Sequence, residues 1–176
     1  SFSVSPGRPR ITCAVESAAE KLAKRNIKST AHVILGLPGE TEKDFIYTAK
    51  KLAELPFSGV KVHNLLVLRK TPLAAIYERE KFKALNEYEY AAALKDFLLE
   101  TPGKRVIMRI QADAPEKDII APKWWMKKGQ FLDYFKNFFA EGKDSRNKIS
   151  SVKTSDGSYT LYHPAYKQNF HSGAGA

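Results

Sequence analysis

The chain of 176 residues contains a single cysteine, and this scarcity excludes two classes of protein. One thiol cannot build a disulfide framework within the chain, so a disulfide-rich secreted scaffold is excluded. Cys13 alone cannot supply the several thiolates that an iron–sulfur cluster needs, and no metal site is predicted. We expect Cys13 to be a small buried apolar residue on a helix, in a protein of the reducing cytoplasm.

Long apolar runs and a secretion signal are also missing. The longest apolar segment, 60–68, is interrupted by Lys61, His63 and Asn64, and it falls far short of the roughly 18 residues that cross a membrane. We therefore expect no membrane partner. The chain begins at Ser1 without an initiator methionine or a signal peptide, and we interpret this start as a cut edge.

Acidic residues are few relative to basic ones. The 29 lysines and arginines outnumber the 19 aspartates and glutamates, which gives a formal net charge of +10. Such an excess favours polyanionic partners, RNA or DNA among them. The alternative is that these side chains are solvated surface charges without a partner.

Apolar periodicity predicts alternating helices and strands. The spacing predicts helices over 14–24, 41–53, 72–79 and 86–99, and strands over 30–36, 60–68 and 105–111.

The order strand, helix, strand predicts an α/β fold with parallel strands and crossover helices. Thr41 and Asp44 resemble a capping box at the start of the second helix. The run at 30–36 has β-branched and apolar residues on both of its faces, so we expect a strand that is buried on both faces.

The rest of the chain is less regular. We expect an irregular loop to about Pro122, followed by a helix that includes Trp124 and ends near Gly142. A polar segment then marks a domain boundary that separates 1–142 from 143–176. In the second part, the sequence predicts a short β-hairpin tail around Asp156-Gly157.

Ligands of open parallel sheets bind beyond the carboxyl ends of the strands. The first such place is the segment Gly36-Leu37-Pro38-Gly39-Glu40, which precedes a predicted helix. Glycines permit close backbone approach, and the N-terminus of a helix offers N–H groups to a carboxylate or phosphate. Ordinary turn chemistry is the alternative interpretation.

The segment His32-Val33-Ile34-Leu35-Gly36-Leu37-Pro38-Gly39-Glu40-Thr41 resembles the fifth-strand motif of radical S-adenosylmethionine (radical SAM) enzymes, in the form found in YhcC/YtqA (Elongator-like) members. Residues 62–74 are similar to the sixth strand and its turn, and 109–113 and 119–124 to the last strand and the loop beyond it. The resemblance extends over about 14–141. It implies the C-terminal part of a partial (β/α) barrel.

The resemblance also implies cofactor contacts. Ile34 and Gly36 match the positions that contact S-adenosylmethionine, while Leu66 and Val67 would line its adenine side. The alternative is that these residues are ordinary core.

Substrate-side candidates follow from the same resemblance, and catalytic residues stay unassigned. His63, Arg109 and Asp113 lie at or near strand ends, where the family places its substrate cavity. Alternatively, His63 is a core residue with paired ring nitrogens, and Arg109 and Asp113 form a buried ion pair. Trp124 and Trp125 either stack on bases or pack in the core.

The chain departs from the family pattern in three places. Lys70 and Ala112 replace glycines, which puts close backbone approach at those turns in doubt. The Cys-x3-Cys-x2-Cys loop that holds the [4Fe-4S] cluster is absent. The resemblance therefore implies that the cluster belongs to a full-length parent, and that this chain has no radical activity alone.

A second resemblance begins at Thr154-Ser155-Asp156-Gly157-Ser158-Tyr159 and continues to Ala176. It is similar to the opening of the methyltransferase domain that completes 5-methylaminomethyl-2-thiouridine at the tRNA wobble position. An unrelated hairpin is the alternative.

Together the resemblances imply a fragment of a radical SAM enzyme that acts in tRNA wobble-uridine modification, with tRNA as its partner. Two other functions stay open. One is a non-catalytic basic module that binds RNA or a protein partner. The other is a (β/α) enzyme with phosphate bound at the Gly36 to Glu40 turn.

Overall fold

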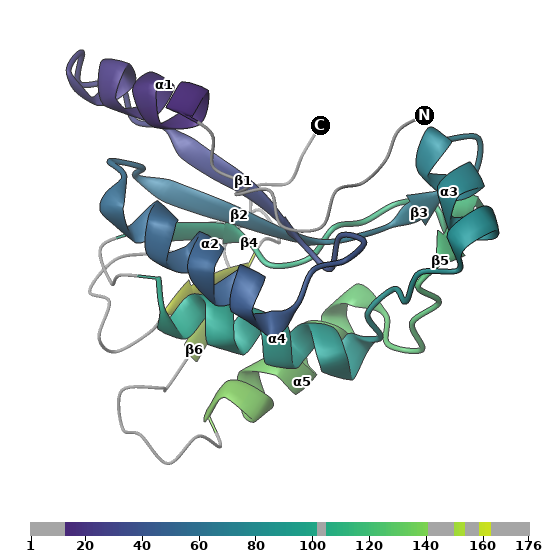
Figure 1. Cartoon of the computed structure of the whole chain (residues 1–176). Coiled ribbons are helices and arrows are strands. Elements are labelled where there is room, and N and C mark those ends of the chain that lie inside the picture. Colours follow the sequence, from purple (N-terminus) through teal and green to yellow (C-terminus); the bar gives the residue numbers. More distant parts are fainter. Residues whose placement is uncertain (1–12, 102–104, 141–149, 154–158, 163–176) are drawn as a thin grey trace.

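A parallel sheet of three strands organises the protein. The computed structural model describes residues 13–101, 105–140, 150–153 and 159–162. The strands β1 (Thr30–Leu35), β2 (Gly59–Asn64) and β4 (Val106–Arg109) follow the order β1-β2-β4. Over the described residues the sheet is open and not a closed barrel, so the predicted α/β class with parallel strands is confirmed (Figure 1).

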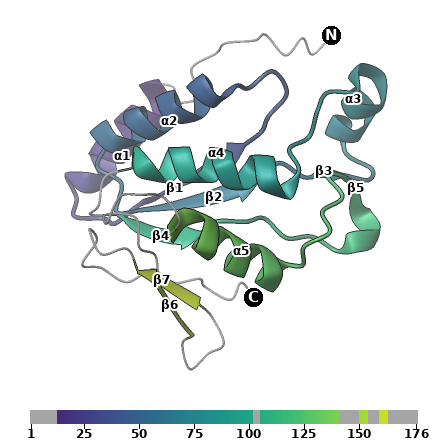
Figure 2. The same cartoon turned by 90° about the horizontal axis from the view of Figure 1, so that it is seen from below.

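Three helices cover one face of this sheet. α2 (Glu42–Glu54), α4 (Glu87–Leu99) and α5 (Lys128–Ala140) lie side by side beneath the strands (Figures 1 and 2). Their apolar sides recur at helical spacing and meet the inward side chains of the strands. The largest fully buried aromatic side chains of this core are Tyr90, Phe97, Phe131, Phe135 and Phe139.

Capping residues set where two of these helices begin. The Thr41 N–H and hydroxyl both donate to the Asp44 carboxylate, at 2.8 and 2.7 Å. Asn86 accepts the N–H groups of Tyr88 and Glu89 at 3.0 and 2.9 Å. These bonds satisfy donors that a helix leaves unpaired in its first turn. The capping box predicted at Thr41 is thus confirmed.

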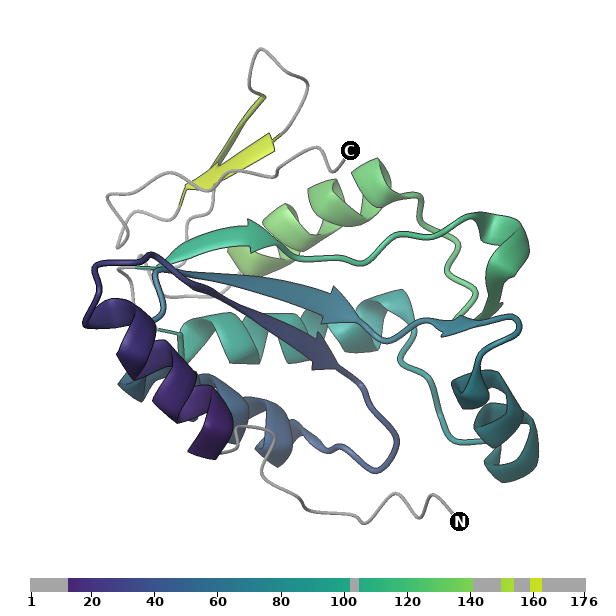
Figure 3. The same ribbon diagram turned by 90° about the horizontal axis from the view of Figure 1, so that it is seen from above.

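The opposite face of the sheet has no described helix over it. α1 (Cys13–Ala23) lies beside the start of β1, and Figure 3 looks directly onto the exposed strands. In β1 the side chains alternate, and Ile34 is 43% exposed on this face. The prediction that this strand is buried on both faces is therefore wrong, because helices cover only one side. We call this surface the open face.

The apolar run at 60–68 forms two strands instead of one. β2 ends at Asn64, whose buried Oδ1 accepts the Ala112 N–H at 2.8 Å. The chain then forms β3 (Val67–Leu68), which pairs antiparallel with β5 (Ile119–Ala121). α3 (Pro72–Glu80) follows as predicted.

The segment 110–122 is also more ordered than predicted, because η1 (Glu116–Asp118) precedes β5. The last described helix begins at Lys128, so Trp124 precedes it and the predicted helix start is wrong. The reason is local: Lys127 N–H donates to Gln130 Oε1 at 2.9 Å, which caps the helix at that point.

Cys13 is exposed at the first residue of α1, so the prediction of a buried cysteine is wrong. The physical reason is that α1 buries only Ala19.

The strands β6 (Ser150–Lys153) and β7 (Tyr159–Tyr162) pair antiparallel, which confirms the predicted hairpin. Its turn at Asp156-Gly157, the predicted stop at Gly142 and most of the tail lie outside the described residues. No helix in the described ranges is both long and apolar enough to cross a membrane.

Candidate functional site

The carboxyl ends of β1, β2 and β4 meet at one edge of the sheet, at the right of Figure 3. The Leu65 N–H donates to the Leu35 carbonyl at 3.1 Å, and the Ala112 N–H donates to Asn64 Oδ1 at 2.8 Å. These two bonds fix the three strand ends relative to one another. Asn64 was missed by sequence reasoning, although a polar residue that ends an apolar strand is a usable signal.

The turn after β1 is closed by its own carboxylate. Gly36 and Gly39 adopt left-handed conformations, with φ of 89° and 78°. Glu40 Oε2 accepts the N–H groups of Gly36 and Leu37 at 2.9 and 2.7 Å. Consecutive N–H groups directed at one anion form an anion-binding arrangement, which Glu40 already occupies. Phosphate at this turn is therefore disfavoured, because it would have to displace a carboxylate.

Two predicted residues are neighbours on the open face. Ile34 and His63 are register partners on β1 and β2, and the His63 ring stacks on His32 with ring centroids 5.8 Å apart. His63 Nε2 is buried and has no hydrogen-bond partner in the described part of the chain. The alternative hypothesis, in which hydrogen bonds pair both ring nitrogens of His63, is therefore wrong for Nε2.

Burial favours the neutral form of the His63 ring. It lowers the pKa of His63, and the neighbouring Arg109, His32 and Lys61 lower it further. Arg109 pairs in register with Lys61 on β2, two positions before His63. The open face combines an exposed apolar side chain, an imidazole and cations, which suits a ligand with an apolar ring and a carboxylate group.

The two apolar candidates that follow β2 differ in their surroundings. Leu66 is half-buried and lines a cavity, whereas Val67 is fully buried against Ala74 and Ala121. Val67 is therefore a core residue, which is the alternative to a cofactor contact that the sequence left open.

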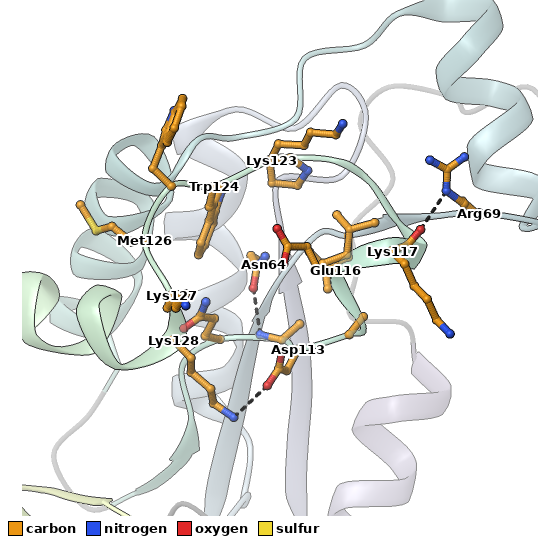
Figure 4. A pocket seen from close by; sticks show the side chains of 17 residues that line it. Asn64, Arg69, Asp113, Glu116, Lys117, Lys123, Trp124, Met126, Lys127 and Lys128 are labelled. Carbon is orange, nitrogen blue, oxygen red and sulfur yellow. Dashed lines mark hydrogen bonds and ion pairs between the residues drawn. The ribbon is translucent and has the colours of Figure 1, made fainter.

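That cavity measures about 610 Å3 and lies between the end of β2, the segment 111–128 and the start of α5 (Figure 4). Five of its lining residues are basic and two are acidic: Arg69, Lys117, Lys123, Lys127 and Lys128 against Asp113 and Glu116. The cavity is therefore a basic site at the edge where parallel sheets bind ligands.

Asp113 lies at this cavity and not beside Arg109. It is exposed and pairs with Lys128 Nζ at 3.4 Å (Figure 4). The alternative of a buried ion pair between Arg109 and Asp113 is therefore wrong. Exposed pairs of this kind contribute little stability, so Lys128 can exchange Asp113 for another anion.

The two adjacent tryptophans have opposite environments. Trp124 donates from Nε1 to the Leu85 carbonyl at 3.0 Å, and its ring lies 5.0 Å from that of Phe131. Trp125 is 94% exposed. Core packing is therefore confirmed for Trp124, and Trp125 has its indole in solvent.

The turn that carries Lys70 keeps a conformation that suits glycine. Lys70 has a φ of 62°, a left-handed value that costs energy for a residue with a Cβ. Lys70 therefore keeps the backbone conformation that the glycine of the family pattern would adopt. At the second departure, the backbone N–H of Ala112 donates to Asn64 Oδ1 at 2.8 Å.

The residues present do not fit an iron–sulfur cluster. Among the described residues, no three His, Cys, Asp or Glu side chains are grouped to hold a metal ion. The single cysteine is consistent with this result.

Comparison with known proteins agrees with this geometry. Residues 57–140 match the model of the Radical_SAM C-terminal domain. YtqA of Bacillus subtilis is 35% identical over 120 residues, which cover 68% of this chain and 37% of YtqA. YhcC of Escherichia coli K12 is 27% identical over 101 residues, which cover 57% of this chain and 33% of YhcC.

An uncharacterised protein of Methanocaldococcus jannaschii is 38% identical over 104 residues, which cover 58% of this chain and 32% of that protein. The chain thus spans about a third of the length of the curated relatives it matches. A solved structure of Elp3 from Methanocaldococcus infernus, with residues 1–46 deleted, has a similar fold. It aligns with a TM-score of 0.62 at 19% identity, over 86% of this chain and 42% of Elp3.

The match of residues 57–140, the similarity to part of YtqA and the open parallel sheet with its one-sided helical layer together support a C-terminal domain of the radical SAM type.

Proposed function

We propose that the open face is one wall of an S-adenosylmethionine site in an enzyme that modifies the wobble uridine of tRNA. The observation that carries the proposal is the exposed face at the strand ends, where Ile34 lies beside the neutral His63. Isoleucine on a strand is normally covered. A ligand, or a segment outside the described residues, would cover it here.

The described residues fit part of a cofactor site. Ile34 offers an apolar contact to an adenine ring, and Gly36 directly follows the end of the same strand. The missing Cβ of Gly36 makes room for Leu85. Leu66 lines the adjoining cavity, where a substrate would meet Asp113, while His63 and Arg109 lie on the open face. When bound next to a reduced [4Fe-4S] cluster, S-adenosylmethionine supplies hydrogen-abstracting chemistry.

The cluster ligands would come from residues that this chain does not contain. We therefore propose that the chain has no radical activity by itself, and that its parent is the enzyme. The basic charge supports tRNA as the partner, because docking to RNA depends largely on contacts with phosphate.

The boundary at residue 142 and the methyltransferase-like start in 143–176 also belong to this proposal. Their support is the sequence resemblance alone, because most of that segment lies outside the described residues. A cytoplasmic location is proposed from the single, unpaired cysteine.

A non-catalytic RNA-binding module is the second candidate. The basic cavity and the lack of cluster ligands among the described residues favour it. Salt-dependent tRNA binding that S-adenosylmethionine leaves unchanged, even when the cluster-binding part is supplied, would support this candidate over the first.

The reading frame upstream of Ser1 tests the proposed function. We expect transcript sequencing in the source cells to find three cysteines with Cys-x3-Cys-x2-Cys spacing ahead of this segment. Cluster ligation needs those thiolates, and this chain lacks them. A stop codon or an unrelated domain directly upstream would contradict the proposal.

A further inference from the structure

Trp125 presents an exposed indole ring to solvent from an anchored backbone. Its side chain is 94% exposed, while its backbone N–H donates to Oε1 of the buried Glu87 at 3.0 Å. The preceding Trp124 is held in the core by its bond to Leu85. These two hydrogen bonds hold the backbone at Trp124 and Trp125 in place, although the Trp125 ring packs against almost nothing. Core packing does not explain such a residue.

Cations flank this ring in the same cavity. Lys123 and Lys127 lie two residues to either side of Trp125 and are exposed, and neither forms an ion pair with a described residue. Arg69 uses Nε to donate to the Lys117 carbonyl at 2.9 Å, and Figure 4 shows this bond at the far side of the cavity. Its terminal guanidinium nitrogens stay available for a phosphate.

The cavity has a size and a lining that suit one nucleotide. Its volume of about 610 Å3 falls within the range of about 300–1,000 Å3 that small-molecule sites occupy. Leu66, Ile119 and Met126 supply apolar surface, and the basic side chains line the same space. An acidic peptide would satisfy the cations without using the exposed indole. A base with its flanking phosphates uses both.

We propose that this cavity binds one unpaired nucleotide of an RNA, with Trp125 stacked on the base and Lys123, Lys127 and Arg69 contacting the flanking phosphates. The base must be unpaired, because a duplex buries its base faces and leaves none for an aromatic side chain. The inference deepens the proposed function, and it rests on that function only for the choice of RNA over DNA.

The test measures binding of a fluorescently labelled single-stranded RNA octamer to the whole chain by anisotropy, at several salt concentrations. We expect Trp125→Ala to weaken binding by about tenfold, within the range measured for removal of one stacking interaction. Trp125→Phe keeps an aromatic face and should restore most of the affinity. The double variant Lys123→Gln/Lys127→Gln should also reduce the steepness of the salt dependence, by about 0.7 for each phosphate that the protein no longer neutralises.

Matched controls separate this site from general charge and exposure. Tyr47→Ala removes a different exposed aromatic ring, and Lys24→Gln/Lys43→Gln removes the same charge from exposed positions far along the sequence. Both should bind the octamer within about twofold of the unsubstituted chain. The thermal midpoint of Trp125→Ala should not change, because its ring is in solvent.

Three results would overturn the proposal. The first is an equal loss of RNA affinity in Trp125→Ala and Tyr47→Ala. The second is an equal loss of RNA affinity in the two double-lysine variants. The third is that the protein binds a base-paired octamer as tightly as the single strand. Equal binding of a deoxyoctamer would overturn the assignment to RNA. An upstream frame without the cysteine motif would contradict the proposed function but would not alter these affinities, so the two failures are distinguishable.

Discussion

Gly36→Val is expected to lower the free energy of unfolding by about 3 kcal/mol. The left-handed φ of 89° costs a residue with a side chain about 1–2 kcal/mol. A Cβ at this position would also lie 2.9 Å from Leu85 Cδ1 and 3.1 Å from Leu85 Cγ. The Leu85 side chain packs against the core and has little room to move away, so overpacking adds about 1–3 kcal/mol. Urea denaturation followed by circular dichroism measures the change.

Two other glycines separate these causes. Gly39 has a φ of 78°, but no atom lies within 4 Å of the position that a Cβ would take there, so Gly39→Val should cost only the backbone strain of about 1–2 kcal/mol. Gly129 lies in α5 with free space around it, so Gly129→Ala should raise the stability by about 0.5 kcal/mol. Equal losses from Gly36→Val and Gly39→Val would refute the close contact with Leu85.

Arg105→Ala should lower the free energy of unfolding by a similar amount, about 3 kcal/mol. The guanidinium donates to the carbonyls of Ala53, Leu55 and Phe57, at 3.0, 2.6 and 3.1 Å. These carbonyls lie at and beyond the end of α2, where a cation is also favoured by the helix dipole. Truncation leaves three acceptors without this donor, at about 1 kcal/mol each. Urea denaturation at neutral pH measures the loss.

Conservative and exposed substitutions check this assignment. Arg105→Lys keeps the charge but loses the planar fork, so we expect it to recover only about half of the stability. Arg79 forms an exposed ion pair with Glu80, and Arg79→Ala should cost less than about 0.5 kcal/mol. If Arg105→Ala costs no more than Arg79→Ala, Arg105 does not hold α2 against the start of β4.

Local patterns were sufficient to predict most of the fold. The capping box at Thr41 and Asp44 and the apolar spacing of α4 depend on neighbours within one or two turns, so the sequence displays them directly. The parallel pairing of β1 and β2 follows from the helix between them. The match of residues 57–140 to the Radical_SAM C-terminal domain agrees with the resemblance predicted from residues 62–74.

The errors concern contacts between residues far apart in the sequence. The end of β2 depends on the hydrogen bond that the Ala112 N–H donates to Asn64 Oδ1, 48 positions away, which no local pattern reveals. The exposure of Ile34 depends on which face the helices cover, and an apolar strand looks the same in either case. The bonds from Gly36 and Leu37 to Glu40 are local, and glutamate shortly after two glycines could have indicated them.

The cations of the cavity illustrate the same limit. Arg69 and Lys117 are distant in sequence and meet only because β3 pairs with β5. Net charge predicted a polyanionic partner, but only the fold shows where five basic residues gather. The different environments of Trp124 and Trp125 likewise depend on the bonds to Leu85 and Glu87.

The central claim is that the open face is one wall of an S-adenosylmethionine site, and nuclear magnetic resonance tests it most directly. S-adenosylmethionine is titrated onto the chain carrying 13C-labelled isoleucine methyl groups and 15N-labelled glycine. We predict progressive shifts of the Ile34 methyl and the Gly36 amide, with no shift at Ile107, which is buried. Equal shifts at Ile34 and Ile107, or no shift at Ile34 and Gly36 at the highest ligand concentration, would contradict the claim.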